Sequence, residues 1–581
     1  MGSLFGFSGP PEPVLLDRMD RVLRHRGGGQ RLDDQSPFGT IGCRPLGGPE
    51  RLAGAAGLHT EGEAAVALVG YITNRSDFAE PFLPGLLDLY RQEGLALVRR
   101  LRGAYILVIR DDRTFYLVRD GAGVRTAYYG RHDGRFIFAI EPKGVLAVPG
   151  FPRRIRPGAV AQYLTFSFIP GPGTMLTDLS EVPAGHYVSW VDGGPPRLTR
   201  YFRFETEGQE NGLPDREWVD RFRRIFSRAV AERLPAGEPL GLFLSGGIDS
   251  SVVAAEAARL YPRPVKTYAI HFGEKYSNEL PYARAVARRV GTDHEDVLIR
   301  PKDFLPRLRR IIWHLDDPIG DPITVPNFEL SAHVSRDVRW VLNGEGGDPV
   351  FGGPKNIPMM LQHWYGGLTR GPGFREKAYL ASYRRCYNDL ERLLTPEWRR
   401  QYDPVEELEG VLTPFFESPA PADFLGKLQV INMRLKGAHL ILPKVDRMTG
   451  AWGLRPLAPL FDERLLALSL ALPPRLKLDR GVEKVVLKQA YRNDLPPEVI
   501  ARPKSGMRVP VHFWFRGELK RYARKILNRR RLRADGIFNE KRVRQHLDYD
   551  VEEGPGRYGI RLWMLITFEI WRRVVVEGEA P

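Results

Sequence analysis

The sequence predicts an α/β protein in two parts, with a β-rich part over residues 1–206 and a parallel α/β part over residues 216–581. Strand-like runs separated by Gly and Asp turns fill about the first 200 residues, a pattern typical of packed antiparallel sheets. Farther along, long helical patterns alternate with short apolar runs, which indicates a parallel sheet covered by helices. Residues 207–215 are rich in Glu and Gly and separate the two patterns, so they are the best linker candidate.

The individual elements follow from local hydrophobicity and turn residues. The clearest strand-like runs are residues 64–72, 104–110, 114–118, 135–140, 240–244, 265–271 and 340–343. From about residue 360 the chain is mostly helical, and Pro-rich stretches at residues 442–462 and 495–511 predict irregular interruptions. A helical insert over residues 354–424 carries aromatic side chains that either line a large pocket or pack within the insert. They are Trp364, Tyr365, Tyr379, Tyr383 and Tyr387.

Composition narrows the class of protein. The 581-residue chain is 43% apolar, and its apolar runs fall short of the roughly 20 residues that a membrane-spanning helix needs. Because the start also lacks a basic-then-apolar signal pattern, we expect a cytoplasmic protein. The formal charge is +16, but the densest basic run, residues 520–533, has few aromatic residues to stack on bases, which favours a solvated surface over a nucleic-acid site. Cys43 and Cys386 lie far apart and support neither a disulfide framework nor a zinc site.

Residues 243–251 predict a strand, a phosphate-binding turn and a helix start. Gly246 and Gly247 allow successive N–H groups to converge on one anion, and the serine hydroxyls that flank them add donors at the helix N-terminus. Asp249 fits such a site if a cation lies between it and the phosphates, so Mg²⁺ is implied. The spacing differs from the Walker loop and resembles the pyrophosphate loop of enzymes that split ATP into AMP and pyrophosphate. An ordinary Gly-Ser turn is the alternative.

The chain as a whole resembles the asparagine synthetase family. The resemblance is carried in the second half by residues 245–251, 278–283, 343–353, 443–448 and 502–506, and in the first half by residues 23–27, 69–74, 101–105 and 119–123. It implies a four-layer α/β/β/α domain like the N-terminal-nucleophile (Ntn) glutaminases over residues 1–206. It also implies an ATP-pyrophosphatase domain, like the adenine nucleotide α-hydrolases, with a helical extension over residues 216–581. ATP and Mg²⁺ are the implied cofactors.

The glutaminase half departs from the family pattern at two positions. The family requires a cysteine directly after the initiator Met, because its thiol attacks glutamine and its α-amine serves as the base. Gly2 stands at that position, and Val69 replaces an Asn that helps to hold the oxyanion. We therefore expect no glutamine hydrolysis from this degenerate site and a scaffold role for the first half.

The resemblance also assigns roles in the second half. Asp249 and Asp348 are the predicted Mg²⁺ ligands, although Asp348 could instead cap a helix. Glu345 is the predicted base that removes a proton from the attacking amine, and Lys504 is predicted to stabilise charge during acyl transfer, a surface lysine being its alternative. The residues predicted to contact ATP or pyrophosphate are Leu244, Ser245, Gly246, Gly247, Asp249, Ser250, Ser251, Ile270, Gly344 and Lys484.

Two further sites bear on the substrate. Arg455 stands where asparagine synthetases usually have Glu, and Leu457 where they usually have Arg, which speaks against free aspartate. Asp446 and Arg447 form either a buried ion pair or a substrate contact.

A carboxylate-activating enzyme without its own ammonia source needs an amine that arrives with the substrate. Residues 165–170, 352–356 and 502–510 resemble lasso-peptide macrolactam cyclases, relatives of the β-lactam synthetases. That branch implies ATP-dependent adenylation of an Asp or Glu side chain in a leader-cleaved peptide, ring closure by the peptide's N-terminal amine, and a leader-binding protein and leader peptidase as partners. An ammonia-dependent asparagine synthetase, a β-lactam synthetase-like ligase and a non-catalytic scaffold are the alternatives.

Overall fold

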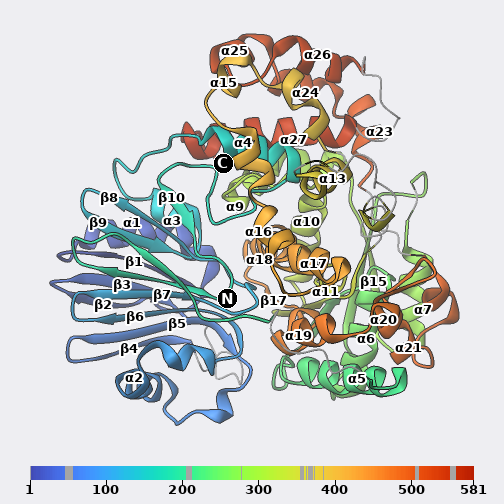
Figure 1. Ribbon diagram of the computed structural model, residues 1–581, viewed down its shortest axis with the longest axis horizontal. Helices are drawn as coiled ribbons and strands as arrows, with labels where there is room; N and C mark the ends of the chain where they lie inside the picture. The colour runs from blue at the N-terminus through green and yellow to red at the C-terminus, as the bar shows by residue number, and fades with distance from the viewer. Residues whose placement is uncertain are drawn as a thin grey trace.

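The computed structural model describes residues 2–45, 56–204, 212–276, 278–353, 359–361, 363, 371, 373–383, 385–503, 509–549 and 558–581. Two stacked sheets form one half of the molecule, a parallel α/β layer forms the other, and the C-terminal helices lie above the second half (Figure 1). The predicted linker is only partly described, so the boundary between residues 206 and 216 stays a prediction.

The first half contains two antiparallel sheets, each of six strands within the described residues. The first sheet has the order β10 (Leu179–Glu181), β8 (Tyr128–His132), β9 (Arg135–Ala139), β1 (Ser3–Ser8), β3 (Gly39–Arg44) and β2 (Leu32–Ser36). The second has the order β12 (Arg197–Arg200), β11 (His186–Val191), β7 (Thr114–Arg119), β6 (Gly103–Asp111), β5 (Ala64–Ile72) and β4 (Gly57–Glu61). The four strand-like runs predicted in this half are therefore confirmed as β5, β6, β7 and β9.

Alternation along β5 shows how the layers are built. Ala65, Ala67 and Val69 face the core between the two sheets, whereas Val66 and Leu68 face the core under helix α2 (Phe82–Glu93). Side chains alternate across a strand, so an unbroken apolar run fits a strand that is covered on both faces. Helices α1 (Pro13–Leu23) and α3 (Pro142–Leu146) cover the first sheet. The expected α/β/β/α fold is confirmed.

The second half is built on a five-stranded parallel sheet, counted over the described residues. Its order is β15 (Asp293–Leu298), β14 (Lys266–His271), β13 (Leu240–Phe243), β16 (Trp340–Asn343) and β17 (Arg455–Leu457). β14 and β16 lie on opposite sides of β13, so the strand order reverses there. In open parallel sheets, ligands bind at the carboxyl ends of the strands beside such a switch point.

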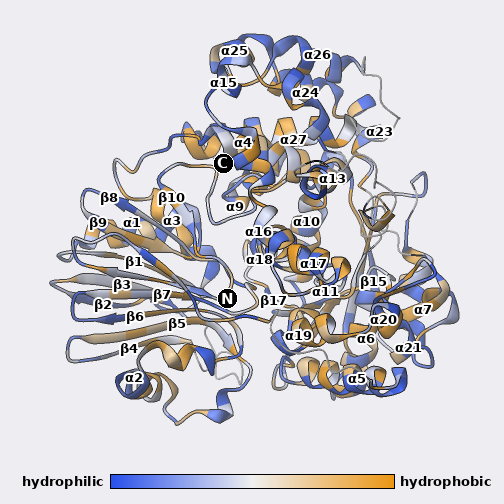
Figure 2. Ribbon diagram, in the orientation of Figure 1, coloured by the Kyte–Doolittle hydropathy of each residue, from blue (hydrophilic) through white to orange (hydrophobic). Residues whose placement is uncertain are grey.

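Helices cover this sheet and extend beyond it. Those around the sheet are α5 (Asp215–Ala231), α6 (Ile248–Leu260), α7 (Leu280–Val290), α9 (Leu308–Leu315), α10 (Thr324–Val334), α11 (Gly347–Phe351), α19 (Glu463–Ala471) and α21 (Val485–Ala490). The C-terminal group comprises α23 (Val511–Arg516), α24 (Lys520–Ile526), α25 (Arg529–Asp535), α26 (Glu540–Asp548) and α27 (Tyr558–Trp571). Apolar α27 packs against α9 and α23, and its hydrophobic colour contrasts with the hydrophilic α26 (Figure 2). No helix in the described ranges is long and apolar enough to cross a membrane.

The prediction of an irregular stretch over residues 442–462 is wrong for its first part. Helix α17 (Phe424–Ile431), the wider helix η8 (Asn432–Ile441) and α18 (Leu442–Gly450) follow one another without a break. Pro443 lies in the first turn of α18, where the fixed proline φ suits a helix. The proline therefore marks a change of helical geometry rather than a loop.

Buried polar contacts join the two halves. Asp446 of α18 forms ion pairs with Arg26 and Arg125 of the first half. Arg119 donates a hydrogen bond of 2.9 Å to the Ala438 carbonyl oxygen of η8. Asp446 thus takes part in a buried ion-pair cluster, one of its two expected roles, but with partners in the other half of the chain.

Candidate active site

Two loops meet at the switch point of the parallel sheet. The loop after β13 holds Ser245 to Gly247 and leads into α6, whose first turn carries Asp249. The loop after β16 holds Gly344 to Gly346 and leads into α11, whose first turn carries Asp348. The two strands end together because Phe243 pairs with Asn343. A Cβ atom on Gly344 would lie 2.5 Å from the Ser250 nitrogen, and one on Gly347 would lie 2.2 Å from Asp249 Oδ1. These glycines let the two loops touch.

The first loop has the geometry of a glycine turn. Gly246 has a φ of +72°, and a Cβ there would lie 2.5 Å from the Ala283 nitrogen, at the start of α7. The Ser245 N–H donates to Ser250 Oγ at 3.1 Å, and the Ser251 hydroxyl donates to the Gly247 carbonyl at 2.8 Å. The serines hold the turn in shape, and Ser250 also faces the cavity described below.

Lys484 joins the two predicted metal ligands. Its Nζ donates to Asp249 Oδ2 at 2.5 Å and also to Asp348 Oδ1. Lys484 is fully buried, whereas the Asp348 side chain is 31% exposed. Two carboxylates from the first turns of separate helices therefore converge on one ammonium. This arrangement was not predictable from the sequence, because the three residues span more than 230 positions.

The carboxylate pair fits a magnesium ion that arrives with a nucleotide. Mg²⁺ prefers oxygen ligands and is commonly held by one or two carboxylates, phosphate oxygens and water. Asp249 and Asp348 together carry two negative charges, of which Lys484 offsets one. Over the described residues, no group of three or more His, Cys, Asp or Glu could hold a metal ion without outside ligands. Phosphate oxygens would have to complete the coordination.

A cavity of about 300 Å³ opens beside the two loops. The predicted site residues that line it are Leu244, Ser245, Asp249, Ser250, Ile270, Gly344, Glu345 and Asp348. Gly246, Gly247, Ser251 and Lys484 do not line it. Gly247 and Lys484 instead line a small pocket together with Glu483, Lys488 and Arg502, so three of its four charged lining residues are cationic.

Sequence reasoning missed four charged residues of this cavity, Lys436, Lys444, Asp321 and Glu279. Burial lowers the pKa of Lys436, and the nearby carboxylates of Asp348, Asp321 and Glu345 offset only part of that shift. Lys444 lies 2.7 Å from Asp321 Oδ2. Burial alone would raise the pKa of Asp321, but the Lys444 ammonium, Arg385 and the Ile323 N–H together hold the pKa below its ordinary value. Lys444 lies in residues 443–448, one of the stretches that resemble the asparagine synthetase family, whereas Lys436 lies outside all of these stretches.

Glu345 lies at the mouth of the second loop. Its backbone N–H donates to Asn343 Oδ1 at 3.1 Å, which orients the turn, and its side chain borders the cavity. The structure thus places Glu345 and Lys436 on one cavity, where a carboxylate and an ammonium can act on the same reactant. Lys504 lies outside the described residues, so its role stays a prediction.

The substrate argument from Arg455 needs correction. Arg455 begins β17 and pairs in register with Trp340, the first residue of β16, and its guanidinium lies 4.7 Å from the Trp340 ring centroid. The site lies at the other end of these strands, after Asn343. Arg455 therefore does not stand beside the acyl site, and only Leu457, which pairs with Leu342, lies toward it.

Of the five aromatic residues predicted either to line a pocket or to pack within the insert, Tyr379 and Tyr383 lie in the core, and Tyr387 is partly buried against it. Tyr379 and Tyr383 are buried, their ring centroids lie 5.4 Å apart, and Tyr383 also contacts Phe166. Neither lines the cavity at the loops. Trp364 and Tyr365 lie outside the described residues.

In the first half, Gly2 and Val69 lie against each other. A Cβ on Gly2 would lie 3.0 Å from Val69 Cγ1 and 2.9 Å from the Arg44 carbonyl oxygen. Gly2 also has a φ of +87°, which L-residues with a side chain rarely adopt. The backbone at position 2 is thus shaped for glycine, and the neighbouring valine fills the space beside it.

Comparison with known proteins agrees with these two halves. Residues 221–573 match the asparagine synthase family model, and residues 84–202 match the glutamine amidotransferase domain. Glutamine-hydrolyzing asparagine synthetase 1 of Bacillus subtilis (strain 168) is 25% identical over 520 residues, covering 85% of this chain and 80% of that protein. Glutamine-hydrolyzing asparagine synthetase 3 of the same strain is 25% identical over 444 residues, covering 72% and 69%. The chain therefore belongs to the asparagine synthase family, whose asparagine synthetases are ATP-dependent, AMP-forming carbon–nitrogen ligases.

Proposed function

We propose that this protein is a macrolactam synthetase that activates a carboxylate of a leader-cleaved peptide with ATP and joins it to the peptide's own N-terminal amine. The contact between Gly2 and Val69 carries the proposal, because position 2 has no side chain, little room for one and a backbone suited to glycine. A family member that releases no ammonia from glutamine needs nitrogen from another source. An amine on the substrate itself supplies it.

The chemistry follows the family's two steps. A carboxylate oxygen of the substrate attacks the α-phosphorus of ATP, and pyrophosphate leaves. The amine nitrogen then attacks the acyl carbon, an amide forms, and AMP leaves with the bridging oxygen. In this proposal Glu345 would accept the amine proton and Lys436 would hold the substrate carboxylate or the leaving AMP, which is supported by their lining one cavity. Lys484, Lys488 and Arg502, which line the small pocket at Gly247, would offset charge on pyrophosphate.

Mg²⁺ would be held by Asp249 and Asp348, and when bound it would neutralise charge on the phosphates. A leader-binding protein and a leader peptidase are proposed partners, since the amine must be exposed by leader removal before ring closure.

A second candidate is asparagine formation from aspartate and ammonium. The position of Arg455 supports this second candidate, because Arg455 lies away from the acyl site and therefore does not argue against aspartate as the substrate. The family match is equally compatible with this reaction.

The test is a product assay with purified protein, ATP and Mg²⁺. Candidate leader-free peptides and, separately, aspartate with ammonium are incubated with wild type, with Asp249→Asn, and with Asp548→Asn as a matched control in an exposed ion pair. We expect a peptide product lighter by one water, with equal amounts of AMP and pyrophosphate, from wild type and Asp548→Asn only. Asparagine formation without any peptide product would replace the proposal by the second candidate.

A further inference from the structure

A second cavity lies between the two halves rather than at the loops that carry the chemistry. Its volume is about 860 Å³, and it is lined from the first half by residues between 156 and 203 and from the second by residues between 406 and 439. The latter group includes the last part of the helical insert. A cavity of this size suits a ligand of several residues, whereas one amino acid would leave most of it unfilled.

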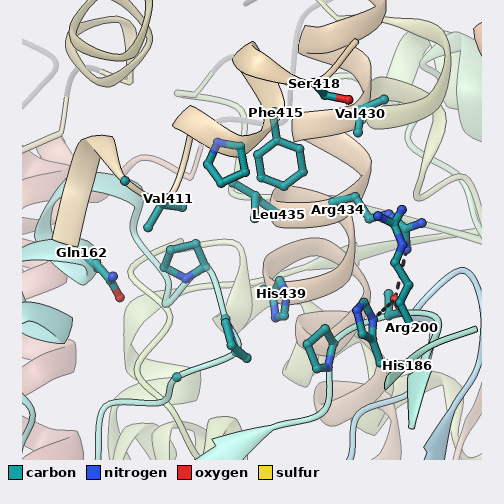
Figure 3. Close-up of a pocket in the computed structure, with 18 of the residues that line it drawn as sticks. Gln162, His186, Arg200, Val411, Phe415, Ser418, Val430, Arg434, Leu435 and His439 are labelled. Atoms are coloured by element: carbon teal, nitrogen blue, oxygen red, sulfur yellow. Dashed lines mark hydrogen bonds between the residues drawn. The ribbon is translucent and has the colours of Figure 1, made fainter. Parts of the chain in front are cut away.

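The cavity has an apolar middle and a basic end (Figure 3). Val411, Phe415 and Leu435 line the middle. At the basic end, Arg200 and Arg434 both donate to the Phe202 carbonyl oxygen, at 3.3 and 3.5 Å, so the two guanidinium groups lie close together.

The charge at that end comes from arginine. Burial lowers the pKa of His186 to about 4, so this histidine is neutral at pH 7. Arg156, on the opposite wall, is paired with Glu407 at 2.6 Å. The described lining residues include four arginines, Glu406 and Glu407. Guanidinium groups bind carboxylates with paired N–H donors, and Arg200 and Arg434 both line the cavity.

Helix η8 lies between this cavity and the cavity of about 300 Å³ beside the two loops. In η8, Leu435 and His439 line the large cavity, whereas Lys436 and Leu440 line the cavity beside Glu345. Neighbouring residues of the same helix therefore face the two cavities. A helix with its side chains is about 10 to 12 Å across, a span of about three to four extended residues.

We propose that the large cavity binds the tail of the peptide substrate, the segment that follows the activated acidic residue, with a tail carboxylate at the arginine end. This inference rests on the proposed macrolactam synthesis. A peptide whose acyl group lies beside Glu345 reaches the cavity only when its tail extends past η8, so tails shorter than about four residues gain nothing from it. Burial of an apolar tail then orders the substrate before ring closure.

The test compares pyrophosphate release for three peptides with the same ring-forming segment. One ends at the acceptor residue, one carries an eight-residue apolar tail with a free carboxylate, and one carries the same tail amidated. The variants are Val411→Trp, which fills the middle, and Arg200→Gln, with Arg197→Gln as a matched control on the same strand outside the cavity lining.

We expect Val411→Trp to raise KM for both tailed peptides about tenfold and to leave the tail-less peptide unchanged, which also shows that the variant folds. Arg200→Gln should raise KM for the free-carboxylate tail alone, and Arg197→Gln should change nothing. Equal KM values for all three peptides in wild type, or no effect of Val411→Trp, would overturn the tail site.

Calorimetry with the isolated tail peptide separates this inference from the proposed function. If wild type releases no pyrophosphate with any peptide, the macrolactam function fails. The cavity is still supported as a peptide site if the tail peptide binds wild type and does not bind Val411→Trp. If the tail peptide binds wild type and Val411→Trp equally well, the cavity is not its binding site.

Discussion

Removing the ammonium of Lys484 is the most direct test of the active-site geometry. In Lys484→Met, Asp249 and Asp348 keep their carboxylates but lose the cation between them. Asp249 Oδ2 lies 2.5 Å from Nζ and Asp348 Oδ1 is bonded to the same nitrogen, so these two oxygens are no more than about 5 Å apart. Two unit charges at about 5 Å repel by about 3 kcal/mol at an effective dielectric constant of about 20.

The loss of a buried partner adds to this repulsion, while the partial exposure of Asp348 reduces it. We therefore expect the free energy of unfolding to fall by about 3 kcal/mol, measured by urea denaturation without metal. Lys488→Met is the control. Its ammonium donates to the Arg502 carbonyl at 3.3 Å, so its removal does not bring the two carboxylates face to face.

Adding Mg²⁺ tests whether Asp249 and Asp348 bind a metal ion or only form an ion pair with Lys484. In Lys484→Met the ion can take the place of the ammonium, and at ten times its dissociation constant it should restore about 1.4 kcal/mol. Adding Asp348→Asn to Lys484→Met should recover stability without metal, because the repulsion is gone. A loss below about 1 kcal/mol in Lys484→Met, or the same Mg²⁺ effect in Lys484→Met and Lys488→Met, would refute the reasoning.

Three further results are expected. Gly347→Ala should cut pyrophosphate release at least 100-fold, because its Cβ would lie 2.2 Å from Asp249 Oδ1, whereas Gly28→Ala, with no atom within 4 Å of the new Cβ, should keep wild-type rates. Asp446→Ala should lower the free energy of unfolding by about 3 to 5 kcal/mol and speed limited proteolysis between the halves, because Arg26 and Arg125 each lose one buried ion-pair partner; unchanged proteolysis would count against that role. Burial raises the pKa of Glu463 to about 8, so the free energy of unfolding should fall as pH rises from about 4.5 toward 8. Glu463→Gln should flatten that pH dependence and raise the free energy of unfolding by about 1 to 2 kcal/mol at pH 8, as urea denaturation across pH can check.

The pH prediction follows from proton uptake. A carboxyl whose folded pKa exceeds its unfolded pKa binds more protons when folded, so its contribution is fully present below the unfolded pKa and is lost as pH rises through the folded value. For Glu463 burial is the largest cause, and the neighbouring carboxylates of Asp120 and Asp462 add to it. A slope of the opposite sign would show that Glu463 is ionised in the folded protein.

Much of the layered fold was predictable because it depends on local patterns. The runs that became β5 and β16 were predicted with the bounds the structure shows, since apolar continuity between turn residues is a property of neighbouring positions. The glycine turn was also predictable from the sequence, because the positive φ that Gly246 adopts is readily available only to glycine. The helix α18 was missed because Pro443 reads as a breaker in sequence, yet it lies in a first turn that tolerates it.

The sequence by itself determined the family, the two-part α/β organisation, the nucleotide loop and the absence of a thiol at position 2. Only the tertiary structure decided which charges meet. It brought Lys484 between Asp249 and Asp348, placed Lys436 beside Glu345, moved Arg455 away from the acyl site and opened a cavity between the halves. The physical reason is that hydrophobic periodicity acts over a few residues, whereas an ion pair or a cavity depends on segments hundreds of residues apart that only the packed sheets and helices bring within a few ångströms.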